Sequence, residues 1–170
     1  MNELQNKYSA EIQRILAKYP PDQKRSAVMP LLYLAQREKG HIEPEAIREI
    51  AELLEISATD VSSVAGFYTL FHEDPGGRYR IQVCSDLPCA LRGAEKFLED
   101  LCAYLKVKVG ETSPDGLFIV EEVKCLAACH RAPMFQLQGD GNLVYYENQT
   151  LQTATALIEE LRERAQEVKA

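Results

Sequence analysis

The feature that most limits how this chain can fold is a set of four cysteines in two close pairs. Four residues separate Cys84 from Cys89, three separate Cys125 from Cys129, and 35 residues lie between the pairs. Each pair follows a segment whose composition predicts a β-strand. If those strands are neighbours in one sheet, both loops leave it at the same edge and the four sulfurs can converge. A site made of all four cysteines would require a fold that places residues 84 and 125 close together.

Residues 1–75 are predicted to form an N-terminal helical bundle. Apolar residues recur there with a helical period. The four predicted helices run from Tyr8 to Tyr19, from Ala27 to Gly40, from Pro44 to Leu54 and from Ser57 to Ala65. Pro30 is expected to bend the second helix locally or to remove one of its backbone hydrogen bonds. The aromatic residues from Phe67 to Phe71 are expected to pack between helices. The turn sequence at residues 74–77 marks the domain boundary.

Residues 76–170 are predicted to form an α/β domain, because the hydrophobic period changes after the turn. The expected elements are strand 79–83, helix 88–105, strand 117–123, a hairpin of 134–138 with 143–146, and helix 151–166. This order within one short domain is typical of a thioredoxin-like α/β sandwich. The predicted fold class of the whole chain is α+β.

The paired cysteines predict a site of soft thiolate ligands, which suits zinc or an iron–sulfur cluster. A 2Fe–2S cluster takes two thiolates for each iron, as two close pairs supply. Zinc sites more often use C-x2-C, although the spacing of Cys84 and Cys89 lies within their range. A dithiol oxidoreductase is the weakest alternative, because the chain has no C-x-x-C. Cys102 lies on the apolar stripe of its predicted helix and is expected to be a packed core thiol.

A thiolate-bound cluster is anionic and needs hydrogen-bond donors and positive charge around it. The candidates nearest in sequence to the cysteines are Arg92, Lys124, His130 and Arg131. The alternative for each is a surface residue without function. A cis peptide bond before Pro133, bracing the second cysteine loop, is also left open.

Charge and composition exclude several functions. The formal net charge is −7, from 19 basic and 26 acidic residues, which argues against nonspecific nucleic-acid binding. The longest apolar stretch, residues 28–35, is far shorter than the ~18–20 residues that span a bilayer. The first residues have no features of a secretory signal. We expect a soluble, cytoplasmic chain with reduced thiols. No phosphate-binding glycine motif is present, so we expect no nucleotide to bind.

Two segments resemble the cluster segments of the 24-kDa, or E, subunit family of respiratory NADH:quinone oxidoreductase (complex I). They run from Val83 to Gly93 and from Glu122 to Met134, and residues 25–32 and 64–71 are also similar to family motifs. The similarity extends from about residue 10 to residue 165. The family often has glycine where this chain has Ala127, and hydroxyl-rich residues at positions 86–87. Neither departure removes a ligand.

The resemblance implies a 2Fe–2S cluster held by Cys84, Cys89, Cys125 and Cys129 in the thioredoxin-like domain. It implies an electron-transfer subunit that exchanges single electrons with the FMN of a partner subunit. FMN and NADH would bind only that partner, so the chain alone would not turn over NADH.

The resemblance also implies further iron–sulfur partners in a peripheral arm, no nucleic acid, no direct membrane insertion, and a cytoplasmic position at the inner face of the membrane. One alternative is the equivalent diaphorase subunit of an NAD-linked hydrogenase or formate dehydrogenase. Another is a zinc-stapled interaction module without a redox role.

Overall fold

The computed structural model describes residues 3–167, apart from the side chain of Glu38. The chain divides into two compact units, Met1–Pro75 and Gly76–Ala170, which we call the N-terminal and C-terminal units. The first is helical, and the second combines helices with a four-stranded sheet. The α+β class predicted from the sequence is confirmed. Among residues 3–167, no helix is both long enough and apolar enough to cross a bilayer.

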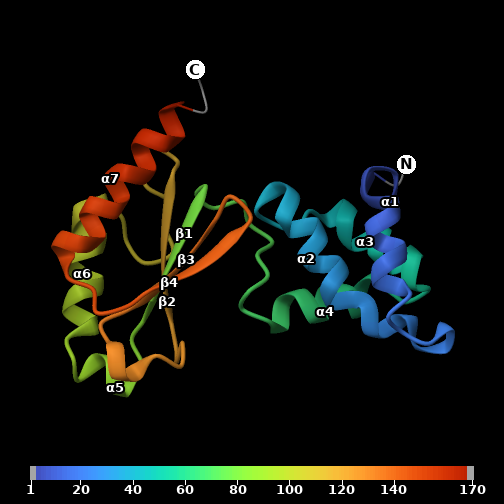
Figure 1. Cartoon of the computed structure of the whole chain (residues 1–170), viewed down its shortest axis with the longest axis horizontal. Coiled ribbons are helices and arrows are strands. Elements are labelled where there is room, and N and C mark those ends of the chain that lie inside the picture. Colours follow the sequence, from blue (N-terminus) through green and yellow to red (C-terminus); the bar gives the residue numbers. More distant parts are fainter. Residues whose placement is uncertain (1–2, 168–170) are drawn as a thin grey trace. The chain divides into compact units, whose positions relative to one another are not determined.

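The N-terminal unit contains the four predicted helices (Figure 1), namely α1 (Glu3–Leu16), α2 (Val28–Lys39), α3 (Pro44–Leu54) and α4 (Ala58–Phe67). A 3-10 turn, η1 (Pro21–Ala27), joins α1 to α2. The apolar stripes meet in one core whose fully buried members include Leu31, Leu32, Ile50 and Val61. The Ser57 side chain accepts a hydrogen bond from the N–H of Asp60 at 3.1 Å. This bond caps α4.

Two details of the N-terminal unit differ from expectation. Helix α1 ends at Leu16 rather than Tyr19. Pro30 lies in the first turn of α2, because that helix begins at Val28. Backbone N–H groups in a first turn have no acceptor within the helix. Pro30 therefore removes no helical hydrogen bond, and the expected bend does not follow.

The sheet of the C-terminal unit has the order β2-β1-β3-β4. Its strands are β1 (Tyr79–Cys84), β2 (Phe118–Val123), β3 (Phe135–Gly139) and β4 (Asn142–Tyr146). Strand β1 is parallel to β2 and antiparallel to β3, and β3 and β4 form a hairpin. Helices α6 (Ala94–Leu105) and α7 (Leu151–Glu167) lie on one side of the sheet (Figure 1). This arrangement is the predicted thioredoxin-like sandwich.

The two faces of the sheet differ in chemistry because side chains alternate along each strand. The helix-covered face carries apolar residues, including Ile81 and Val83, which pack in the core with α6 and α7. The opposite face carries a polar network across three strands. In it, Gln82 donates to Glu121 at 2.9 Å, accepts from Gln136, and lies beside an Arg80–Glu121 ion pair. This network ties β1 to both of its neighbours.

The helix predicted over residues 88–105 is wrong as one continuous element. The structure has a short α5 (Leu87–Ala90) followed by α6, which begins at Ala94. Gly93 separates them with φ of +87°, a conformation that glycine adopts without steric cost. The break lets α5 stay with the first cysteine loop while α6 packs against the sheet.

The Asp115 side chain stabilises the loop before β2 through hydrogen bonds. Its carboxylate accepts hydrogen bonds from Ser113 Oγ at 2.5 Å, Leu117 N–H at 3.0 Å and Arg162 Nε at 2.9 Å. Burial raises the pKa of Asp115, but these donors more than offset it and leave the pKa below its usual range. The stabilisation is thus present above about pH 4 and lost as pH falls through the lowered pKa.

We expect Asp115→Asn to lower the free energy of unfolding by about 1–2 kcal/mol at pH 7, because charge-assisted hydrogen bonds are weakened. The difference from wild type should shrink below about pH 4, where the native carboxylate takes up its proton. Thermal unfolding of both proteins from pH 3 to pH 8 measures this difference in stability. Glu163→Gln, at an exposed position of α7, is the control. A pH-independent difference would contradict this account of Asp115.

Candidate metal centre

The two cysteine loops leave the sheet at the same edge. Cys84 is the last residue of β1 and pairs with Val123, the last residue of β2. The N–H of Ser85 donates to the carbonyl of Val123 at 3.1 Å, and Cys125 follows two residues later. Because β1 and β2 are parallel neighbours, both chains turn at the same level. The condition set by the sequence, that residues 84 and 125 lie close together, is met.

The first loop holds its cysteines in a tight, capped turn. The Asp86 carboxylate accepts from the N–H of Leu87 at 3.0 Å and so caps α5. The Cys89 N–H donates to the Asp86 carbonyl at 2.8 Å. Cys84 and Cys89 are each only 1% exposed. This loop therefore supplies the buried side of the site.

The second loop turns through left-handed backbone conformations. Cys125 has φ of +47° and Ala127 has φ of +59°. Such angles cost an L-residue energy and favour glycine, which gives a physical reason for glycine at position 127 in the similar family. Cys125 is exposed, and Cys129, which begins the 3-10 turn η2 (Cys129–Arg131), is partly buried. This loop supplies the open side of the site.

The sulfurs lie in two contacting pairs, Cys84 with Cys89 and Cys125 with Cys129. Burial disfavours the thiolate of Cys84, but backbone N–H groups of residues 86, 126 and 125 donate to its sulfur and lower the pKa of the thiol. Burial and the Cys84 sulfur raise the pKa of Cys89 to about 12. Burial, followed by the charge of Cys125, raises the pKa of Cys129.

These pKa directions bear on metal binding, because only the thiolate is a ligand. Among Cys84, Cys89 and Cys129, Cys84 is the one whose pKa is lowered. Thiols with raised pKa must release their protons when a metal binds, so binding at this site is coupled to proton release.

The pairing of the sulfurs bears on the metal that the site could hold. A 2Fe–2S cluster takes two thiolates at each of two irons, and two contacting sulfur pairs match that requirement. The two pairs also lie near each other, because the charges of Cys84 and Cys89 both interact with Cys129. The residues fit a 2Fe–2S cluster.

The protein around the sulfurs is apolar. Cys84 and Cys89 form a buried cluster with Ala94, Ala132 and Met134, against which Leu126 and Ala128 pack. The peptide bond between Ala132 and Pro133 is cis, which resolves the alternative left open by the sequence. Small and apolar side chains let backbone N–H groups approach the sulfurs closely.

Two of the four basic candidates link the cysteine loops. Arg92 Nε donates to the carbonyl of Ala132 at 3.0 Å and so joins the first loop to the second. Lys124 Nζ donates to Ser85 Oγ at 2.8 Å and to Glu122 at 2.5 Å. The Lys124 charge also interacts with Cys84. Lys124 therefore brings a positive charge near the more buried sulfur pair.

The other two basic candidates contact each other, and Arg131 also contacts Glu147. Arg131 pairs with Glu147 at 2.5 Å, and its Nε donates to His130 Nε2 at 3.2 Å. Both side chains are exposed. If His130 accepts from Arg131 at Nε2, the neutral ring carries its proton on Nδ1. Of these basic residues, Lys124 is the one whose charge interacts with Cys84.

Sequence reasoning missed the backbone donors to Cys84 and the Ser85–Glu122 hydrogen bond, which also involves Lys124. The strand-to-loop boundary was visible in the sequence, but the direction of each N–H depends on dihedral angles such as that of Cys125. Cys102 is buried in the core with α6 and the sheet, as predicted, and burial raises its pKa.

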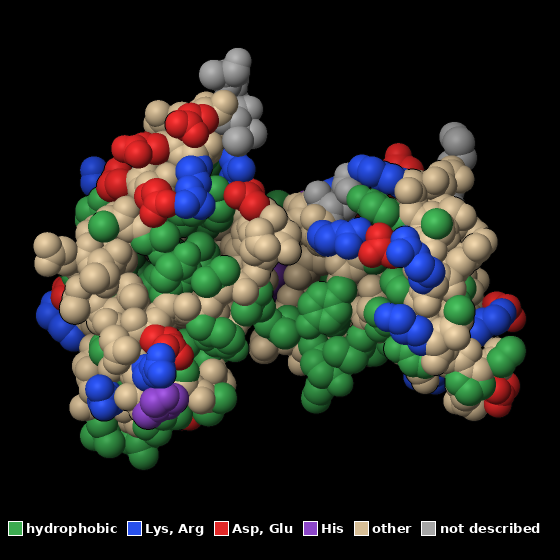
Figure 2. Space-filling model, viewed as in Figure 1, with side chains coloured by type: hydrophobic (Ala, Val, Ile, Leu, Met, Phe, Trp, Pro, Cys, Tyr) green, Lys and Arg blue, Asp and Glu red, His purple; other side chains and the backbone are tan. Residues whose placement is uncertain are grey.

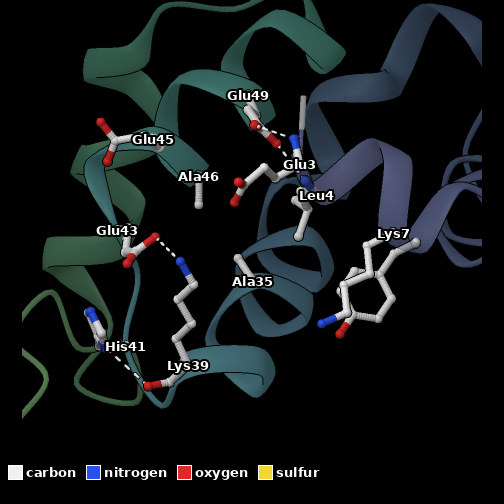
Figure 3. Close-up of a pocket in the computed structure, with 11 residues that line it drawn as sticks. Glu3, Leu4, Lys7, Ala35, Lys39, His41, Glu43, Glu45, Ala46 and Glu49 are labelled. Carbon is white, nitrogen blue, oxygen red and sulfur yellow. Dashed lines mark hydrogen bonds and ion pairs between the residues drawn. The ribbon is translucent and has the colours of Figure 1, made fainter. Parts of the chain in front are cut away.

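A pocket in the N-terminal unit is lined by residues of that unit, none of them a cysteine (Figure 3). Its charged groups are engaged in structural contacts. Glu49 accepts from the N–H groups of Glu3 and Leu4 at the start of α1, at 2.7 and 2.8 Å. Lys39 and Glu43 point toward each other and form an ion pair of 2.5 Å (Figure 3). We assign no binding role to this pocket.

The expectation that the aromatic residues from Phe67, the last residue of α4, to Phe71 pack between helices is only partly correct. Phe71 is buried and contacts Tyr33 with ring centroids 4.8 Å apart. Phe67 is 77% exposed, and Tyr68 is also exposed. Hydrophobic side chains are visible on the surface of the N-terminal unit in Figure 2. The helical period identifies the stripe of α4 but does not extend past its end.

Comparison with known proteins gives the class to which this fold and site belong. The family model described as thioredoxin-like [2Fe-2S] ferredoxin matches residues 12–162. The chain belongs to this family.

Within the family, the chain is 43% identical over 151 residues to NADH-quinone oxidoreductase subunit 2 of Thermus thermophilus, covering 89% of this chain and 82% of that protein. It is 40% identical over 152 residues to the E 2 subunit of NADH-quinone oxidoreductase from Rhizobium meliloti, covering 89% and 87%. The resemblance to the E-subunit family seen in the cysteine segments is confirmed.

Among solved structures, a chain of an NAD+-reducing [NiFe]-hydrogenase in the air-oxidized state has the same fold. The TM-score is 0.66 at 20% identity, and the match covers 79% of this chain and 23% of that chain. At this identity, the likeness concerns the fold alone.

Proposed function

We propose that this chain is an electron-transfer subunit of an NADH-quinone oxidoreductase and holds one 2Fe–2S cluster through Cys84, Cys89, Cys125 and Cys129. The observation that carries the proposal is the arrangement of these cysteines as two contacting pairs at one sheet edge. Relatives of about 40% identity are named as subunits of that oxidoreductase.

When bound, a 2Fe–2S cluster supplies a centre that accepts and returns one electron. The residues of this chain determine how readily it does so. The N–H groups that donate to Cys84 stabilise negative charge on its sulfur, and hydrogen bonds to sulfur raise a cluster's reduction potential. The apolar cluster around Cys84 and Cys89 keeps water from that side.

The partner in this proposal is a subunit that binds FMN and NADH, with further iron–sulfur subunits beyond it. NADH gives up two electrons as a hydride, whereas this site handles one electron at a time, so a flavin on the partner must divide the pair. The complex would place the chain on the cytoplasmic side, at the inner face of the membrane.

An equivalent diaphorase subunit of an NAD-linked hydrogenase is the second candidate, and a chain of a solved NAD+-reducing hydrogenase shares the fold. An equivalent subunit of a formate dehydrogenase remains within this candidate class. Purifying the native complex and identifying its companion chains separates these functions. A quinone-reducing set of subunits supports the first candidate, and a nickel–iron or formate-oxidising subunit supports the second.

The redox proposal has a direct test. Anaerobically prepared, iron-replete chain should give one unpaired electron per chain by electron paramagnetic resonance after reduction with dithionite. The alternative of a zinc-stapled module predicts a colourless protein with no such signal. An iron-replete sample that stays silent on reduction would show that the site does not carry electrons.

The positive charge of Lys124 predicts a shift in reduction potential. Lys124→Gln removes a charge that interacts with Cys84, and the reduced cluster is more negative than the oxidised one. We expect the potential to fall by less than the ~59 mV that corresponds to a tenfold change in electron occupancy, because Lys124 is exposed and also pairs with Glu122. A redox titration followed by paramagnetic resonance measures it.

Lys96→Gln is the matched control, because Lys96 lies on α6 and pairs with Asp100. Its potential should equal that of wild type within about 10 mV, a small part of the 59 mV that corresponds to a tenfold change. A fall of the same size in both variants would show a general effect of net charge. An unchanged potential in Lys124→Gln would show that the Lys124 charge does not act on the cluster.

A further inference from the structure

Strand β4 leaves one edge of the sheet open. It lies at the end of the strand order and pairs with β3 alone (Figure 1). The hairpin turn at Asp140 and Gly141 has positive φ at both residues, as in a two-residue type I′ turn. With that turn, Asn142, Val144 and Tyr146 exchange the ladder hydrogen bonds with their partner residues on β3.

The backbone N–H and C=O groups of Leu143 and Tyr145 consequently point away from β3. Among residues 3–167, no backbone–backbone hydrogen bond outside the sheet reaches either residue. The open edge therefore offers two donors and two acceptors in the spacing of an antiparallel or parallel β-strand.

The side chains of this edge are apolar on both faces of the sheet. Leu143 is 44% exposed, Val144 is 43% exposed and Tyr145 is 49% exposed. Residues 142–146 include no lysine, glutamate or proline. Natural proteins usually protect an edge with such residues or cover it, because an apolar edge pairs readily with other strands. An apolar edge strand without such residues indicates that another segment covers it when the protein functions.

The opposite edge shows how this chain covers a strand by itself. A segment before β2 lies along that strand, where Gly110 N–H donates to the Val120 carbonyl and Ser113 N–H donates to the Phe118 carbonyl, each at 2.7 Å. Thr112 also forms a β-bridge to Ile119. The chain thus closes the β2 edge and leaves the β4 edge for another polypeptide.

We propose that the β4 edge binds an extended, apolar segment of the flavin-carrying partner subunit, added to the sheet as a fifth strand. This inference rests on the proposed function, which supplies that partner. Strand addition satisfies the outward backbone groups and covers Leu143, Val144 and Tyr145 on both faces. The partner segment is expected to carry no charge opposite these three residues.

A second copy of this chain fits the edge less well. The three exposed side chains offer on the order of 200–300 Å², whereas a stable interface buries about 800 Å² on each partner. These three side chains alone would therefore not hold a dimer. A segment of a larger subunit needs no such area at the edge, because its other contacts hold the complex together.

Hydrogen–deuterium exchange with residue-resolved mass spectrometry tests the proposal, on the chain alone and in the native complex with its flavin subunit. We expect the amides of Leu143 and Tyr145 to exchange freely in the isolated chain and at least 100-fold more slowly in the complex. The amides of Val144 and Tyr146 should be protected in both. Equal exchange of Leu143 and Tyr145 in the two samples would overturn the proposal.

Two other outcomes are distinguishable. Protection of Leu143 and Tyr145 in an isolated chain that light scattering shows to be dimeric would assign the edge to a second copy and overturn the proposal. Failure to recover the chain with any flavin subunit would contradict the proposed function and this inference with it. Recovery of the complex with β4 still unprotected would contradict the inference alone.

Tyr145→Pro provides a second measurement. It removes the outward N–H, and proline is tolerated on an edge strand where that group faces solvent. Tyr145→Ala keeps the N–H and is the matched control. We expect the proline variant to bind the purified flavin subunit at least tenfold more weakly than the alanine variant, with thermal midpoints within a few degrees. Equal binding by the two variants would count against strand addition.

Discussion

Replacing Cys84 with alanine is expected to abolish the iron–sulfur cluster. One iron would keep a single thiolate, and the backbone N–H groups that donate to Cys84 would lose their acceptor. Anaerobically purified Cys84→Ala should contain less than about a tenth of the wild-type iron, given that a 2Fe–2S cluster needs all four ligands. Iron and acid-labile sulfide analysis, with the visible absorption spectrum, measures the loss.

Cys102→Ala is the matched control for this experiment. Cys102 is also buried, but it packs in the helix-covered core rather than with the paired sulfurs. This variant should keep its full iron content and lose about 1 kcal/mol of stability from the small cavity. Full iron in Cys84→Ala, or loss of iron in Cys102→Ala, would show that the ligands are assigned wrongly.

Gly77→Ala is expected to have the largest effect on stability. A Cβ at position 77 would lie 2.7 Å from backbone atoms of Leu117 and Phe118, at the start of β2. These atoms cannot move without separating β1 from β2, since the Tyr79 N–H donates to the Leu117 carbonyl at 2.7 Å. We expect a loss of about 3 kcal/mol or more.

That loss corresponds to a fall of about 10–20 °C in the thermal midpoint of a domain of this size. Calorimetry measures it. Gly66→Ala is the control, because a Cβ there meets nothing within 4 Å and Gly66 lies in α4. Alanine should stabilise that helix by about 0.5–1 kcal/mol. A Gly77→Ala protein as stable as wild type would mean that β1 and β2 are not packed as closely as described.

Much of the fold could be predicted because it follows from the spacing of apolar residues and the local composition of the sequence. The apolar stripes of α2 and α3 follow from the helical period, and β1 follows from its β-forming composition. The position of the site follows from one further step. Since parallel strands end at the same edge, two cysteine loops after β1 and β2 must meet.

The remaining features depend on dihedral angles and on what lies beyond an element's end. The break between α5 and α6 comes from Gly93 in a left-handed conformation, within a stretch whose apolar stripe is continuous. The donors to Cys84 come from the turn at Cys125, and the exposure of Phe67 follows from where α4 ends. None of these has a periodic signal.

The electrostatics of the site were also only partly visible in the sequence. Four basic residues near the cysteines looked equivalent, but the structure separates them. Lys124 lies near Cys84, Arg92 ties the two loops together, and Arg131 is engaged with Glu147 and His130. Distance along the chain does not show which charge reaches a sulfur.

The central claim is that two cysteine pairs from neighbouring strands hold two irons. Iron, acid-labile sulfide and zinc contents of anaerobically purified wild-type chain, determined together on one sample, test it most directly. The account predicts about two irons and two sulfides per chain and negligible zinc, as a 2Fe–2S cluster requires. One zinc per chain without sulfide, or thiols free of any metal, would contradict it.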